Sequence, residues 1–350
     1  MKTCPQASAA AAAATTNSMK HGPNLGSFRR WSPQSRCPLV RFAHNSGLAG
    51  LFGGALGTGR RAAFTLIELL VVIVIIALLI GILLPSLAKA RQMGKQTRES
   101  SASRQLMAAY LTYSNDNRGS LIPGLTTPGM VNTTPGPGEK VISVVDEKGE
   151  QISGQEARRY PWRIAPYLNY NFRGLYDDDN LLTRYEARGD YIYVVSLSPS
   201  MGINADFVGG KGDPGFSFNP QAIARWGKYF TSRIDEPRNP SNLLVFTSAR
   251  GVDPDGGKVV PGFHMVDSPR LNGLRWAPGT GPFQIAAQPV ATGGVDFRWG
   301  GNKDGSGGQA CVSWMDGHAS MAGIDDLRDM RKWADKASTT YNAGPDWQLP

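Results

Sequence analysis

The residue whose chemistry stands out in this sequence is Glu68, a carboxylate near the start of an apolar run. The run extends from Phe64 to Leu84, and every residue after Glu68 within it is apolar or glycine. A helix needs about 20 residues to cross the hydrocarbon core of a bilayer, so the run is long enough to span one. A carboxylate in such a segment is costly without a partner, which makes Glu68 a candidate functional group.

Residues suited to catalysis are sparse in the rest of the sequence. From Phe64 onward the chain has two histidines, His264 and His318, and one cysteine, Cys311. Neither a His-x-x-x-His nor a Cys-x-x-Cys pair suited to zinc occurs, and no Gly-x-Ser-x-Gly nucleophile elbow is present. We therefore expect no enzymatic activity. Asp316-Gly317 is a favoured hairpin pair, and Cys311 is expected to be a buried small side chain.

A glycine-rich loop offers the best candidate metal site. Asn302, Asp304 and Ser306 place oxygen-bearing side chains at alternate positions, and hard cations such as calcium take several oxygen ligands. A flexible surface turn is the competing interpretation. The cluster Asp177–Asn180 is expected to be a solvated loop or the start of a helix. Calcium is the only cofactor that the sequence suggests.

The charges on either side of the apolar run bear on its orientation. Arg60 and Arg61 precede it. Five cations follow it closely: Lys89, Arg91, Lys95, Arg98 and Arg104. Lys and Arg concentrate on the cytoplasmic side of a span, so this local count disfavours export of the C-terminal part, although long domains translocate largely regardless of charge. We expect that part to be exported and the five cations to form a solvated helix face.

The stretch from Arg60 to Leu69, with the sequence RRAAFTLIEL, resembles the class III signal of type IV pilins and type II secretion pseudopilins. In that family a membrane aspartyl prepilin peptidase cuts before the Phe and methylates the new amino terminus. The resemblance implies cleavage between Ala63 and Phe64 and N-methylation of Phe64. Glu68 and Pro85 stand where the family carries Glu and Pro, which implies roles in assembly. The family usually has Gly before the cut, where this chain has Ala63.

Two other interpretations of the apolar run are an ordinary signal anchor and a secretory signal peptide. Ala88-Lys89-Ala90 has the small-residue pattern of a conventional cut site, but the run is longer than the roughly 7–15 apolar residues of a secretory signal. Neither alternative has a reason to place Glu68 inside the run. We therefore favour the pilin-like signal.

The segment before the cut carries most of the positive charge of the chain. Residues 1–63 contain eight Lys or Arg and no acid, so their removal leaves 29 cations against 28 acids and lowers the net charge from +9 to +1. The high isoelectric point therefore does not describe a processed protein, and bulk charge gives no reason to expect nucleic-acid binding.

One long helix is predicted from Phe64 to Asn117, because no proline occurs between Ser86 and Asn117 and small or apolar residues recur at helical spacing. Pro85 should kink this helix or divide it in two. Gly119 suits the left-handed position that ends a helix. In its second half, small or apolar residues recur at roughly helical spacing in two sets: Leu87, Ala90, Gly94, Ser101, Gln105 and Ala108, and Leu106, Ala109, Tyr110 and Tyr113.

The region after Gly119 predicts a mostly antiparallel β domain. Residues 119–138 form a Pro- and Gly-rich linker. Strands are expected at 141–145, 243–247, 297–299 and 310–315, with a return strand at 318–321; helices are expected at 160–168 and 325–337, and 191–195 is a strand or a buried helix.

The predicted fold class is therefore α+β, with a long N-terminal membrane-spanning helix packed on an antiparallel sheet. The domains are a leader peptide (1–63), a transmembrane and stalk helix (64–118) and a pilin-like globular domain (119–350).

Two C-terminal motifs resemble a group of bacterial pseudopilin-like proteins with a large insertion. They are the hairpin Trp314–His318 and the run Arg298–Gly301, where relatives often have Arg-His-Gly-Gly and this chain has Trp299. Some pseudopilins bind calcium near the end of the sheet, which is compatible with the loop around Asp304.

The resemblance implies a pseudopilin or minor pilin that assembles into a type II secretion pseudopilus or a type IV pilus-like filament. Its partners would be the prepilin peptidase, other pilin or pseudopilin subunits, the membrane and the secretion or pilus machinery. It would cross the inner membrane once, with its C-terminal domain in the periplasm or on an extracellular filament. The alternative is a monomeric, signal-anchored surface binding protein.

Overall fold

The structure is a computed structural model that describes residues 65–131, 142–172, 175–176, 182–183, 186–187, 189–212, 217, 220–252, 259–269, 294–301, 307–339 and 344–347. The chain divides into two units, Met1–Phe64 and Thr65–Pro350, and every described residue belongs to the second.

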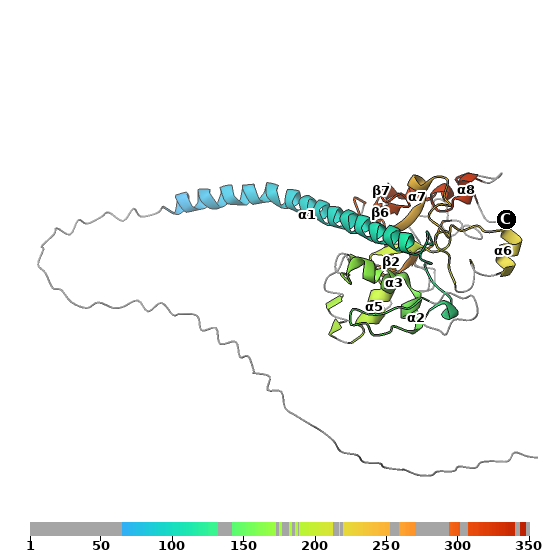
Figure 1. Ribbon diagram of the computed structural model, residues 1–350. Coiled ribbons are helices and arrows are strands. Elements are labelled where there is room, and N and C mark those ends of the chain that lie inside the picture. Colours follow the sequence, from blue (N-terminus) through green and yellow to red (C-terminus); the bar gives the residue numbers. More distant parts are fainter. Residues whose placement is uncertain are drawn as a thin grey trace, which may run out of the picture. The chain divides into compact units, whose positions relative to one another are not determined.

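The first element is a single helix, α1 (Leu66–Asp116), which Figure 1 shows as one continuous coil. Pro85 lies inside it, so the two-helix alternative is wrong. A proline removes one backbone donor from the hydrogen-bond ladder, and in a 51-residue helix the neighbouring turns remain bonded. The helix ends where the sequence predicted, because Asn117 caps it and Gly119 adopts a positive φ of 82°.

The central sheet is built around β2 (Leu244–Val252). Its path runs in the order β4 (Met265–Val266), β1 (Met201–Asn204), β2, β6 (Gln309–Trp314) and β7 (Ala319–Gly323), and β3 (Val259–Pro261) and β5 (Gly294–Val295) also pair with β2. All of these pairs are antiparallel except that of β1 with β4. The α+β prediction with a mostly antiparallel sheet is therefore confirmed.

The C-terminal half of α1 packs against the sheet, chiefly on β6, and also contacts β2, β7 and α3 (Tyr160–Ile164). Tyr110 on the helix meets Phe246 of β2 edge to face, with ring centroids 5.3 Å apart. Of the two sets at helical spacing, Leu106, Ala109 and Tyr110 are buried against the domain. The set with Gln105 is exposed, and the buried stripe of the helix begins at Glu99.

The remaining described helical segments are short: η1 (Pro128–Met130), α2 (Gly154–Arg158), η2 (Ala165–Leu168), α5 (Tyr191–Leu197), α6 (Pro220–Trp226), η4 (Pro240–Asn242), α7 (Ile324–Leu327), η6 (Met330–Lys332) and α8 (Lys336–Thr339). Figure 1 shows α2, α3 and α5 grouped together, apart from β6, β7 and α7. The predicted helix at 160–168 is confirmed as α3 and η2, and of the two alternatives for 191–195 the helix, α5, is correct.

The single C-terminal helix predicted at 325–337 is wrong, because this stretch forms α7, η6 and the start of α8. The side chain of Asp329 accepts a hydrogen bond from the backbone N–H of Arg331 at 2.9 Å and starts a new helical turn there. Trp333 is fully buried and its indole donates to the carbonyl of Leu327 at 2.7 Å. Local capping and burial of one large ring thus override the helical periodicity.

Two predicted strands are also wrong. The described part of the first, residues 142–145, contributes single bridges, Val131 with Ile142 and Val145 with Gln151, and Trp299 in the second forms a single bridge with Gln309. The hairpin of β6 and β7 around Asp316-Gly317 and the buried strand β2 are confirmed.

Candidate functional site

The N-terminal half of α1 presents apolar side chains to the outside on every face. From Leu66 to Leu87 each residue is exposed, with Leu66 at 79% and Leu84 at 61%. By length and composition this helix could cross a membrane. An unburied, all-round apolar helix is unstable in water and suits a lipid environment.

The start of this helix is organised by Glu68 and Thr65. Oε2 of Glu68 accepts hydrogen bonds from the backbone N–H and the hydroxyl of Thr65, both at 2.9 Å. The hydroxyl of Thr65 in turn accepts from the N–H of Glu68 at 3.3 Å, which completes a capping box. The predicted cleavage residues Ala63 and Phe64 lie outside the described residues, next to this box.

A second carboxylate, Glu99, joins α1 to the sheet and was missed by the sequence reasoning. Its side chain is 6% exposed. Oε1 accepts from the hydroxyl of Ser248 on β2 at 2.8 Å, and Oε2 accepts from the indole N–H of Trp299. The guanidinium of Arg298 lies 4.0 Å from Oε1. We call Glu99, Ser248, Arg298 and Trp299 the stalk junction.

The partners of the stalk junction are themselves held in place. Arg298 forms an ion pair with Asp296 at 3.1 Å and donates to the carbonyl of Ala249 at 2.9 Å. The hydroxyl of Ser248 accepts from the backbone N–H of Cys311 at 2.8 Å. A sequence signal for this site existed, because Glu99 is the only acid between Glu68 and Asp116. The run beginning Arg298-Trp299 supplies its donors.

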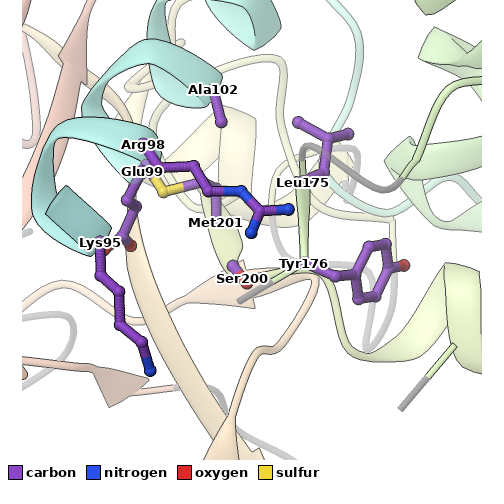
Figure 2. Close-up of a pocket in the computed structure, with 8 residues that line it drawn as sticks. All are labelled: Lys95, Arg98, Glu99, Ala102, Leu175, Tyr176, Ser200 and Met201. Carbon is purple, nitrogen blue, oxygen red and sulfur yellow. The ribbon is translucent and has the colours of Figure 1, made fainter. Parts of the chain in front are cut away.

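A pocket lies beside the stalk junction, between α1 and the segments around 175 and 200 (Figure 2). Its lining is Lys95, Arg98, Glu99, Ala102, Leu175, Tyr176, Ser200 and Met201. In Figure 2 the guanidinium of Arg98 reaches towards Leu175 and Tyr176, whereas Lys95 extends away from them. Two of the lining residues, Lys95 and Arg98, are exposed cations, whereas the apolar lining residues are buried. The pocket is therefore a cleft between α1 and the rest of the domain.

Cys311 has the structural role that the sequence predicted. It is fully buried on β6, and burial raises the pKa of its thiol to about 12. A thiol in that state is neutral and is a poor nucleophile. Nearby, the hydroxyls of Ser103 on α1 and Ser313 on β6 share a hydrogen bond that adds a further contact between helix and sheet.

The two histidines have different environments. His264 is buried, its Nδ1 makes no hydrogen bond, and burial together with the nearby Arg159 lowers its pKa well below the usual value. His318 is half-exposed in the hairpin, where its Nδ1 lies 2.6 Å from Asp316. The ring of His318 stacks on Trp314 with centroids 5.7 Å apart. Asp316 also accepts from the backbone N–H of His318 at 3.1 Å, as expected of turn chemistry.

Among the residues that the structure describes, no group of three or more His, Cys, Asp or Glu is placed to hold a metal ion. The predicted calcium ligands Asn302, Asp304 and Ser306 lie outside those residues, as does the acidic cluster 177–180. The calcium site therefore stays a prediction.

Comparison with known proteins identifies the N-terminal signal. Residues 58–84 match the family model described as the prokaryotic N-terminal methylation motif, which is the signature of type IV pilins and pseudopilins. No curated protein and no solved structure matches the chain. The motif and the exposed apolar helix together indicate a membrane-anchored, prepilin-type chain, of a kind that is generally structural and not enzymatic.

Proposed function

We propose that this chain is a prepilin-type subunit that the prepilin peptidase cuts between Ala63 and Phe64 and methylates on Phe64. The processed subunit crosses the inner membrane once through the apolar half of α1 and exports its C-terminal domain. It then joins other subunits in a type II secretion pseudopilus or a type IV pilus-like filament. The match of residues 58–84 to the methylation motif carries this proposal.

The geometry at the start of α1 supports a role for Glu68 in assembly. The capping box holds its carboxylate beside the backbone N–H of Thr65, the second residue after the proposed cut. Cleavage would place a positively charged amine on Phe64, within one helical turn of this carboxylate. In hydrocarbon an unpaired carboxylate is costly, so Glu68 would favour arrangements in which an amine of its own or a neighbouring subunit lies close.

The apolar surface of α1 supports assembly through the helix. The side chains from Leu66 to Leu84 are exposed around the whole circumference, so they need lipid before assembly and other apolar helices after extraction. The domain begins to bury α1 only at Glu99. The apolar part of the helix, from Leu66 to Leu87, is thus left uncovered by the domain and is available for contacts with neighbouring subunits.

The processing step is tested by mass spectrometry of the N-terminus from cells with an active and with an inactive prepilin peptidase. The expected product begins with N-methylated Phe64 and appears only with the active enzyme. The variant Ala63→Gly, which restores the residue usual in the family, should be processed at least as efficiently. Recovery of an intact N-terminus, or of one that begins after Ala90, would refute the proposal.

The competing function is that of a monomeric, signal-anchored surface binding protein, and the pocket beside Glu99 is the observation that favours it. An anchor needs neither the cut before Phe64 nor the carboxylate of Glu68. Crosslinking of the processed subunit in membranes separates the two functions, because a filament subunit forms a ladder of oligomers and a monomeric anchor gives a single band.

A further inference from the structure

We propose that the part of α1 directly after the membrane span binds anionic lipid headgroups through Lys89, Arg91 and Lys95, which we call the basic segment. The three side chains are exposed. This proposal rests on the membrane-spanning helix of the proposed function, but it requires neither cleavage nor assembly.

The charged residues that follow the span are all positive up to Arg98. No acid occurs between Pro85 and Arg98, and the next acid, Glu99, is buried in the stalk junction. Within the part of the chain that the structure describes, no ion pair or hydrogen bond engages the side chains of Lys89, Arg91 or Lys95. Arg98 has an interaction of its own and is left out of the basic segment. Three cations therefore remain for an anionic partner.

The position of the basic segment selects the lipid surface as this partner. At a rise of about 1.5 Å per residue, Lys89 and Arg91 lie about 8 and 10 Å beyond Leu84. The headgroup layer extends about 5–7 Å beyond the hydrocarbon core, and long basic side chains reach back towards the interface. Lys95 lies about 16 Å beyond Leu84, within roughly one Debye length of the headgroups.

Anionic headgroups would also explain why cations follow the span on the side that is proposed to be exported. Cations that follow a span oppose the translocation of that side. Near an anionic surface, each Lys or Arg instead strengthens binding about fivefold, and the gain disappears beyond a Debye length. The basic segment would therefore hold the unassembled subunit on the exported side, with α1 at a defined depth in the bilayer.

The test uses the full chain with a donor dye attached at Met93→Cys. Met93 lies between Arg91 and Lys95 and is 66% exposed. Cys4 and Cys37 are replaced by Ser, and Cys311 is buried and does not take the dye. The protein is reconstituted in phosphatidylcholine vesicles that contain acceptor-labelled phosphatidylglycerol or, in parallel, acceptor-labelled phosphatidylcholine. Flotation of the vesicles through a density gradient verifies insertion.

We expect energy transfer to report an enrichment of the anionic over the zwitterionic lipid around the parent chain of at least about fivefold, the value for one cation at the headgroups, and loss of this preference in molar salt. A variant with Lys89→Gln, Arg91→Gln and Lys95→Gln should lose the preference. The matched control is Arg104→Gln, which lies about 30 Å beyond Leu84 on the same helix and should keep it.

Equal transfer to the two labelled lipids in the parent chain would overturn the proposal, and so would a preference that survives the triple substitution or disappears in Arg104→Gln. Failure of the proposed function appears in a different measurement, as an unprocessed N-terminus, so the two results are distinguishable.

Discussion

Replacement of the buried Glu99 should destabilise the domain more than a substitution on the exposed surface of α1. Its carboxylate is buried and accepts hydrogen bonds from Ser248 and from Trp299, with Arg298 at 4.0 Å. Hydrogen bonds to charged groups contribute about 1.5–3 kcal/mol each, and breaking a buried charged pair costs about 3–5 kcal/mol. We therefore expect Glu99→Ala to lower the free energy of unfolding by about 4 kcal/mol.

The isosteric variant Glu99→Gln should cost less, about 2 kcal/mol. Its amide oxygen can still accept from Ser248, but its NH₂ group faces the indole N–H of Trp299, so two donors oppose each other. Arg298 keeps Asp296 as a partner at 3.1 Å and is not left unpaired. Trp299→Phe removes the opposing donor, so Glu99→Gln and Trp299→Phe should combine with less than additive cost, by about 1 kcal/mol.

The assay is thermal unfolding in detergent, followed by near-ultraviolet circular dichroism. For a domain of this size 1 kcal/mol corresponds to about 2–4 °C in Tm, so Glu99→Ala should melt about 8–16 °C below the parent. The control is Gln105→Ala, an exposed substitution on the same helix that should fall within about 0.5 kcal/mol of the parent. If Glu99→Ala melts together with Gln105→Ala, the junction does not contribute to stability and the reasoning is wrong.

Three further predictions concern the membrane helix, the glycine-rich loop and a buried histidine. Glu68→Val should insert and be processed like the parent but form few crosslinked oligomers. Normal oligomer formation by this variant would show that the carboxylate has no role in assembly. If the loop at 302–306 binds calcium, millimolar calcium should raise Tm relative to chelator, and Asp304→Ala should abolish the difference; an unchanged Tm in the parent would leave the loop a surface turn. Because the folded state lowers the pKa of His264, the unfolded state binds the extra proton first, so stability should fall as pH drops below about 6.5, by up to about 1.4 kcal/mol per pH unit. His264→Phe should flatten the fall in Tm between pH 7.5 and 5; equal slopes in the parent and the variant would refute this assignment.

The features that depend on residues close together in the sequence could be predicted from it. The apolar run with Glu68 identified the membrane helix, Asn117 and Gly119 identified its end, and Asp316-Gly317 identified the hairpin. Each of these depends on residues that are close in sequence and on strong local physics, namely hydrophobicity, backbone φ and turn geometry.

The features that depend on distant contacts were missed. Glu99 and Trp299 are 200 residues apart in the chain and meet through a hydrogen bond, so the isolated acid on the helix gives no indication of which residues it contacts. The helical periodicity of residues 325–337 is real, but burial of Trp333 and capping by Asp329 break the helix into short turns. Two sets of residues on α1 recur at helical spacing, and only contact with the sheet decides that the set with Leu106 is covered and the set with Gln105 is not.

The uninterrupted helix between Leu84 and Glu99 fixes both a distance along its axis and a rotation about that axis. It sets the clearance between the hydrocarbon core and the first residue that the domain holds, about 22 Å for fifteen residues. Inserting one residue there would raise the domain by about 1.5 Å and rotate it by about 100° around the helix axis. Inserting seven would raise it by about 10 Å and rotate it by only about 20°. The length of this segment thus determines both the height of the domain beyond the apolar part of the helix and its rotation about the helix axis.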